Sequence, residues 1–112
     1  DDDVTKREVS GIAYLDAVIH ESMRLYPVAP FVVRKVSSDL SVPGCDAVIP
    51  AGAFACVWIY GMHRHPRLWC DAERFWPERW LFEEDGDVDA GRKEGAFLPF
   101  ASGPRNCLGR SV

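Results

Sequence analysis

The stretch from Ser10 to Leu25 constrains this chain most, because helical spacing there surrounds charged side chains. Apolar residues recur at Ile12, Leu15, Ile19 and Met23. Further apolar residues surround Glu21 on the opposite face, so the sequence predicts a helix that is apolar on nearly all sides and therefore buried. A buried carboxylate is costly unless it is paired, and Arg24, three residues further on, is its first available partner.

The end of this predicted helix is better determined than its beginning. Pro27 disfavours helical geometry at the residue before it, so the helix is expected to end at Leu25. At the other end, Ser10 is one candidate cap. Thr5 and Glu8 offer a capping box one turn earlier, and both starts remain open.

After Pro30 the pattern changes to short extended runs. Turn signals at 43–44 and 50–52 separate four predicted strands, at 31–36, 40–42, 47–49 and 53–58. We expect a helical turn over 59–63, irregular aromatic-rich chain over 66–80 and an acidic surface loop over 81–93. These few elements predict an α+β arrangement with small antiparallel strands.

The composition contains enough hydrophobic residues to form a core, but it favours little regular secondary structure. The chain has 112 residues, of which 47% are hydrophobic, but its 9 Gly and 8 Pro favour shaped loops over helices and strands. Independent folding is therefore doubtful. The net charge is −4 and no basic stripe is long enough to follow phosphates, which argues against nucleic-acid binding.

No segment of the sequence is typical of membrane insertion or export. The run 47–62 is too short and too interrupted by Pro and Gly to span a bilayer. The first residues, Asp1 to Asp3, are acidic where a signal peptide would be basic, so no targeting segment is predicted. Because the chain also begins without Met, we expect its start to lie inside a longer protein.

Two histidine patterns approach a metal site without completing one. His20 and Glu21 begin an H-E-x-x-H pattern, but its fifth position is Arg24, which has no lone pair for a metal. His63 and His65 lack nearby carboxylate ligands, so a surface or core pair is favoured. Three cysteines without ligand spacing are expected to be reduced core or surface residues: Cys45, Cys56 and Cys70.

The segment 97–109 is the most constrained part of the sequence. Gly103 permits positive φ at a sharp turn, and Gly109 removes a Cβ where a flat ligand could approach the backbone. Arg105 offers a fixed charge for a carboxylate. If Gly109-Arg110 opens a helix, Cys107 lies at its N-terminus, where a thiolate is favoured. An apolar pocket holding such a thiolate is typical of an axial ligand to haem iron.

With these motifs the sequence resembles the cytochrome P-450 family of haem-thiolate monooxygenases. The haem-loop motif F-x-x-G-x-R-x-C-x-G is matched by Phe100, Gly103, Arg105, Cys107 and Gly109. Glu21 and Arg24 match E-x-x-R of the K helix, and 77–80 reads P-E-R-W, where a conservative aromatic change puts Trp80 in place of the usual Phe. The resemblance covers nearly all of the chain and is strongest to eukaryotic microsomal members.

The resemblance implies roles for individual residues. The cofactor-binding residues would be Cys107, Arg105, Phe100, Gly109 and Arg34. Cys107 would be the proximal iron ligand, with Phe100 shielding the sulfur, and Arg105 and Arg34 would pair with the haem propionates. A buried structural network of Glu21, Arg24 and Arg79 would position the meander and the haem loop rather than take part in catalysis.

The resemblance also implies an activity for the parent protein: one atom of O₂ is inserted into a lipophilic substrate, with electrons from an NADPH-dependent reductase. The parent is expected at the cytosolic face of the endoplasmic reticulum membrane. Part of the substrate pocket would follow Val28 to Val33. Residues 1–112 would be an incomplete domain, from the K helix to the start of the L helix, that neither holds haem stably nor turns over alone. A haem-thiolate isomerase or dehydratase of hydroperoxides and a non-catalytic truncated fragment remain alternatives.

Overall fold

A computed structural model describes residues 11–81 and 95–111 of the chain. Its main helix, α2, spans Ala13–Leu25 and ends where the sequence predicts. Tyr26 leaves helical geometry with φ −126° and ψ 63°, and its N–H still donates to the carbonyl of Ser22. Because Pro27 disfavours the α region at this residue, a local signal is enough to end the helix.

The beginning of α2 differs from the prediction. Ile12 occupies the N-cap position in extended geometry, and no side chain caps the helix. The helix therefore starts three residues after Ser10, and the N–H groups of Leu15 and Asp16 bond to the Ile12 carbonyl instead. Ser10 and the capping box at 5–8 lie outside the described residues.

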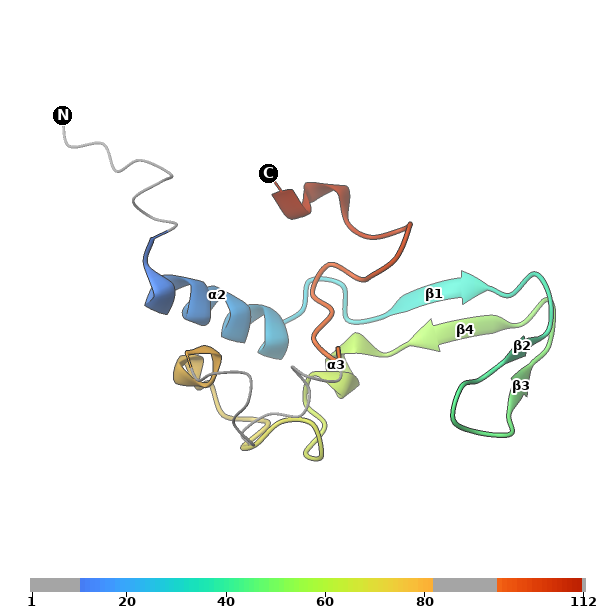
Figure 1. The fold of residues 1–112 in the computed structure, drawn as a ribbon, viewed down its shortest axis with the longest axis horizontal. Coiled ribbons are helices and arrows are strands. Elements are labelled where there is room, and N and C mark those ends of the chain that lie inside the picture. The colour runs from blue at the N-terminus through green and yellow to red at the C-terminus, as the bar shows by residue number, and fades with distance from the viewer. Residues whose placement is uncertain (1–10, 82–94, 112) are drawn as a thin grey trace.

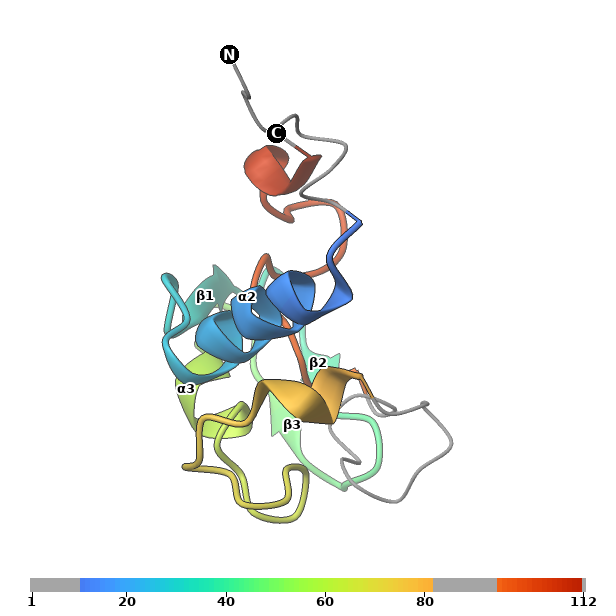
Figure 2. The same ribbon diagram turned by 90° about the vertical axis from the view of Figure 1, so that its left-hand side faces the viewer.

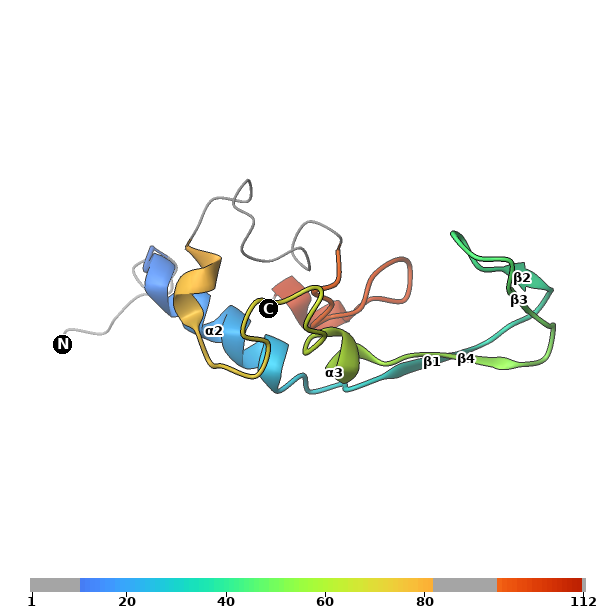
Figure 3. The same ribbon diagram turned by 90° about the horizontal axis from the view of Figure 1, so that it is seen from below.

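Four short strands follow and pair in twos. β1 (Val32–Lys35) is antiparallel to β4 (Phe54–Val57), and β2 (Leu40–Ser41) is antiparallel to β3 (Val48–Ile49). The long β1–β4 ribbon extends away from α2 and carries the β2–β3 pair at its far end (Figures 1 and 3). The small antiparallel strands predicted from the turn signals are therefore confirmed, although each is one or two residues shorter than expected.

Three short helical segments complete the described chain. α3 spans Ile59–Met62, close to the predicted turn, and two 3₁₀ helices span Pro77–Trp80 and Leu108–Ser111. The prediction of wholly irregular chain over 66–80 is wrong at its end, because Pro77 occupies the first helical position, where its fixed φ favours a helix. The first 3₁₀ helix lies alongside α2 (Figure 2). Of the acidic loop predicted over 81–93, only the exposed Leu81 belongs to the described residues.

A small buried centre lies where α2, α3 and the aromatic segment meet. Its apolar members are Ala17, Leu25, Ile59, Trp69 and Ala96, whereas the buried Val36 lies at the far end of the β1–β4 ribbon, where its N–H bonds to the Ala53 carbonyl. Four charged or polar side chains are completely buried in this centre: Glu21, Arg24, His63 and Arg79. The described chain measures 58 × 33 × 22 Å, so this centre occupies only part of an elongated molecule.

The prediction that α2 is buried on nearly all sides is wrong for the described chain. Its buried face carries Ala17, Glu21, Arg24 and Leu25. Ile12, Tyr14 and Ile19 remain 50%, 50% and 46% exposed, because the described segments cover only one face of the helix. Within residues 11–81 and 95–111, no helix is long and apolar enough to cross a membrane.

Candidate functional site

The segment 97–107, here called the cysteine loop, closes on itself through its backbone. The N–H of Cys107 donates to the carbonyl of Phe100 at 2.9 Å, and the N–H of Asn106 donates to the carbonyl of Gly103 at 3.2 Å. Gly103 has φ +83°, which confirms the predicted positive φ at this turn, and Ala101 has φ +58°. The 3₁₀ helix Leu108–Ser111 begins directly after the cysteine, one residue before the predicted helix start.

An apolar cavity of about 370 Å³ adjoins Cys107. It is lined by the end of α2, the turn after it, the first residue of α3 and the cysteine loop: Met23, Pro27, Val28, Ala29, Val32, Ile59, Pro99, Phe100, Ala101, Arg105, Asn106 and Cys107. The Cys107 thiol is free and exposed. The structure therefore brings the predicted ligand, the predicted Arg105 and part of the predicted substrate segment to one wall of one cavity.

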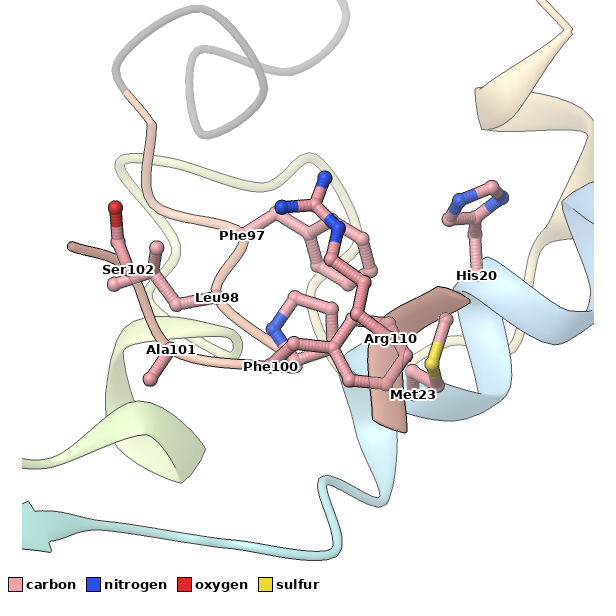
Figure 4. A pocket seen from close by; sticks show the side chains of 9 residues that line it. His20, Met23, Phe97, Leu98, Phe100, Ala101, Ser102 and Arg110 are labelled. Atoms are coloured by element: carbon pink, nitrogen blue, oxygen red, sulfur yellow. The ribbon is translucent and has the colours of Figure 1, made fainter. Parts of the chain in front are cut away.

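A second cavity of about 360 Å³ lies between α2 and the cysteine loop. Figure 4 shows its lining by His20 and Met23 of α2, by Phe97, Leu98, Phe100, Ala101 and Ser102 of the loop, and by Arg110. Four residues line both cavities and so lie between them: Met23, Pro99, Phe100 and Ala101. The position of Phe100 is thus tied both to α2 and to the backbone of Cys107.

Two predicted cofactor residues, Arg34 and Gly109, are not among those that line the first cavity. Arg34 is exposed on β1, and its Nη1 donates to the neighbouring Val33 carbonyl at 2.9 Å. A Cβ added to Gly109 would lie 3.7 Å from the Cys107 sulfur, an ordinary contact, so nothing in the described chain requires glycine there. The predicted roles of Arg34 and Gly109 toward a cofactor stay predictions.

Glu21 is the centre of a buried charge cluster. Arg24 binds it with two hydrogen bonds, Nη2 to Oε1 at 2.7 Å and Nε to Oε2 at 2.9 Å. Arg79 Nε and the Trp76 N–H also donate to Oε1, at 3.1 and 2.9 Å. Burial raises the pKa of Glu21, but the hydrogen bonds from Arg24, Trp76 and Trp80 and the Arg24 charge outweigh it and hold the pKa below its usual value. The buried carboxylate of Glu21, which the sequence predicts to need a partner, is therefore paired.

Arg24 connects this cluster to three backbone carbonyls in two segments of the chain. Its Nη1 donates to the carbonyls of His63 and Ala72 at 2.8 and 2.7 Å, and its Nη2 donates to the Arg74 carbonyl at 3.1 Å. The guanidinium also lies over the Trp69 ring, 5.4 Å from its centroid. Because every one of these partners is fixed by backbone or burial, α2 holds the chain around residues 63–80 in place.

Sequence reasoning missed a further donor to Glu21. The indole Nε1 of Trp80 donates to Glu21 Oε2 at 2.9 Å. The change from Phe to Trp in P-E-R-W is therefore more than conservative, because a phenyl ring has no donor to offer. The signal available in the sequence was the indole itself, since buried Trp N–H groups usually find a partner.

The histidines do not form the metal sites considered from the sequence. His20 Nδ1 bonds to the Asp16 carbonyl at 2.8 Å, and its ring lies 5.2 Å from that of Trp80. His63 is completely buried, whereas His65 is exposed. Among the described residues, no three His, Cys, Asp or Glu side chains gather to hold a metal ion.

Comparison with known proteins identifies the chain. The sequence model of the cytochrome P450 family matches residues 1–112. The chain belongs to the cytochrome P450 family. The resemblance read from the sequence motifs is thereby confirmed, and so is the prediction of haem as cofactor, since P450 proteins hold haem iron through a cysteine thiolate.

Individual P450 proteins match over nearly the whole chain. It is 40% identical to cytochrome P450 3A18 of Rattus norvegicus over 95% of its length, covering 20% of that protein. It is 37% identical to cytochrome P450 4c3 of Drosophila melanogaster, over 95% of this chain and 19% of that protein. It is 40% identical to cytochrome P450 4V2 of Rattus norvegicus, over 96% of this chain and 19% of that protein. The chain spans about a fifth of the length of these relatives.

The chemistry of the first cavity fits a haem held by a thiolate. The Cys107 sulfur is free, and the lining around it is mostly apolar, which suits a flat hydrocarbon ring. Arg105, on the same lining, has the charge that a carboxylate of the ring would need. The cavity volume of about 370 Å³ also falls within the roughly 300–1,000 Å³ usual for small-molecule sites.

Proposed function

We propose that this chain is the haem-holding part of a haem-thiolate monooxygenase, with Cys107 as the axial ligand of the iron. The observation that carries the proposal is the free Cys107 thiol on the wall of an apolar cavity. In the terms of the family, α2 corresponds to the K helix, 77–80 belongs to the meander and the cysteine loop is the haem loop. The chain would then be part of a larger domain rather than a complete one.

The residues of the chain divide the work of holding the cofactor. Cys107 provides the thiolate, and Phe100, whose carbonyl accepts the Cys107 N–H, covers it on the side facing α2. Arg105 pairs with one propionate, and Arg34 is proposed for the other. Glu21, Arg24 and Arg79 are not among the residues that line this cavity, and they bind one another, which favours a structural role.

The proposed activity follows from the cofactor. Thiolate-ligated haem supplies reductive activation of O₂, in which one oxygen atom enters an organic substrate and the other leaves as water. The electrons are proposed to come from NADPH through a separate reductase, at the cytosolic face of the endoplasmic reticulum membrane. Val28, Ala29 and Val32 present an apolar surface in the Cys107 cavity, which supports a lipophilic substrate.

The ligand assignment is tested by replacing Cys107 with alanine in the full-length protein. We expect Cys107→Ala to abolish the thiolate-type absorption band of the reduced, CO-bound protein, because no other cysteine lines the cavity in the described residues and the thioether of Met23 cannot become a thiolate. Cys45→Ala is the matched control, since Cys45 is also a free, exposed cysteine and should leave the band unchanged. A Cys107→Ala protein that keeps the band would refute the assignment.

A further inference from the structure

His63 is a completely buried side chain whose two ring nitrogens are both engaged. Nδ1 lies 3.0 Å from the carbonyl oxygen of Arg24, at the end of α2. Nε2 lies 2.9 Å from the backbone nitrogen of Leu98, at the start of the cysteine loop. The carbonyl of His63 in turn accepts from Arg24 Nη1 at 2.8 Å. Each of Arg24 and His63 therefore bonds through its side chain to the carbonyl of the other, and the imidazole of His63 also bonds to the cysteine loop.

These two contacts determine the protonation of the ring. A carbonyl oxygen can only accept, so Nδ1 must carry the hydrogen that it donates to Arg24. A backbone N–H can only donate, so Nε2 must offer a lone pair to Leu98. Burial and the neighbouring Arg24 charge lower the pKa of His63, which favours the same neutral form although two backbone contacts oppose the shift. The ring is a donor on one side and an acceptor on the other.

The acceptor side leads to the cysteine. Leu98 is two residues before Phe100, and the Phe100 carbonyl accepts the Cys107 N–H at 2.9 Å. The Phe97 ring also packs on the imidazole, with centroids 5.3 Å apart. A shift of the chain at Leu98 would therefore move the carbonyl that holds the Cys107 backbone.

We propose that His63 is a positioning residue for the cysteine loop. Its Nε2 lone pair fixes Leu98 to the end of α2, and through Phe100 this sets where the Cys107 sulfur stands relative to the bound haem. The inference rests on the proposed function, since it assumes that Cys107 is the ligand. It adds that the hydrogen bond accepted from Leu98, and not only the bulk of a buried ring, determines how firmly the haem is held.

The contributions of the two ring nitrogens of His63 can be tested one at a time by replacing the residue with Asn or with Gln. Asn at 63 places its amide nitrogen near the position of Nδ1, so it can donate to Arg24 but is too short to reach Leu98. Gln places its oxygen near the position of Nε2, so it can accept from Leu98. His63→Asn therefore removes the hydrogen bond from Leu98, and His63→Gln removes the hydrogen bond to Arg24. The matched controls are His65→Asn and His65→Gln, because His65 is exposed two residues away.

The experiment uses the full-length haem-loaded protein and measures three quantities. They are the rate of haem transfer to an acceptor protein, the fraction of the reduced CO complex with the thiolate-type band, and the thermal unfolding midpoint. We expect His63→Asn to release haem about tenfold faster and to lose part of the band, because the Leu98 N–H is left without its buried acceptor. His63→Gln should stay within about twofold of the unchanged protein, and both His65 variants should match it.

The inference is overturned if His63→Asn and His63→Gln release haem at the same rate, whether slow or fast. Equal slow rates would mean that the Leu98 bond does not hold the loop. Equal fast rates, with unfolding midpoints lowered together or folding lost in both, would mean that the ring acts only by filling space. If the unchanged protein itself shows no thiolate-type band, the proposed function fails first, which the Cys107→Ala comparison reveals independently.

Discussion

Trp80 gives the buried Glu21 a donor that a phenylalanine at the same place could not. Its indole N–H lies 2.9 Å from Oε2, the oxygen that otherwise accepts only Arg24 Nε among the described contacts. A carboxylate buried this deeply gains from every donor, because hydrogen bonds to the ionised form offset the cost of removing it from water. A single aromatic position thus contributes to the polar centre of the molecule.

We expect Trp80→Phe to destabilise the full-length protein by about 1.5–3 kcal/mol, the usual contribution of a hydrogen bond to a charged group. The measurement is the midpoint of urea unfolding, and the haem spectrum should be retained because the ring still packs beside Phe97. Trp58→Phe is the control, since Trp58 is 64% exposed. An unchanged midpoint in Trp80→Phe would show that the indole N–H contributes nothing to Glu21.

At the scale of the elements, His63 joins the end of α2, the end of α3 and the start of the cysteine loop. Its contacts require the neutral ring, and Arg24 is the charged group that faces it. A proton on Nε2 would replace an acceptor by a donor opposite the Leu98 N–H. The three elements are therefore held by a group that ordinary pH changes can charge.

This arrangement predicts a pH dependence of stability. Burial lowers the folded pKa of His63 below its ordinary value, so the unfolded chain takes up the proton first as pH falls below about 6.5. Stability is therefore complete above that pH and is lost toward lower pH, by up to about 1.4 kcal/mol per unit until the folded pKa is reached. The thermal midpoint measured between pH 8 and 5 should fall less in His63→Gln than in the unchanged protein. Parallel curves would contradict the prediction.

The elements that the sequence predicted well are those with local causes. Pro27 ends α2, and glycines at 44 and 52, with φ +81° and +85°, allow the turns that separate the strands. The 3₁₀ helix Pro77–Trp80 was missed although Pro77 is a local signal for it, because the contacts that hold it in place come from α2, more than fifty residues away. Trp80 and His63 were missed as partners for the same reason, since their hydrogen bonds join distant segments.

In the candidate site too, the sequence predicted the contacts between residues that are close together in the chain and missed those between distant ones. Glu21 and Arg24 could be paired from their spacing, but Arg79 entered only through the family resemblance, and the role of Cys107 as a ligand stays a prediction from its motif. The buried face of α2 was misjudged because periodicity shows that a side chain is apolar and does not show which neighbour covers it. Ile12 and Ile19 fit the helical pattern and are still about half exposed.

At the scale of the whole molecule, the described chain exposes more large apolar side chains than it buries. Sixteen large hydrophobic residues are exposed, among them Val28 at 99% and Leu108 at 98%, against six buried apolar ones. Such a surface marks contact with further protein or with a ligand. It supports the proposal that these residues are part of a larger domain.

We therefore expect residues 1–112, expressed alone, to bind a hydrophobic dye, to associate, and to lose added haem on gel filtration. The reason is that the exposed apolar surface around Cys107 would have nothing else to cover it. The full-length protein under the same conditions is the control and should retain haem. A monomeric 112-residue chain that keeps the thiolate-type band after gel filtration would contradict this expectation.

The buried charge cluster also bears on how the protein is made. Glu21 and the Trp80 indole that binds it are 59 positions apart along the chain. At roughly 5–20 residues per second, a ribosome needs about 3–12 s to add that stretch. During this interval Glu21 and Arg24 are already part of the growing chain, whereas Arg79 and Trp80 have not yet been added. Glu21 can therefore pair with Arg24 at once but receives its donors from Arg79 and Trp80 only after the aromatic segment has been synthesised, so the complete cluster forms late in the synthesis of this stretch.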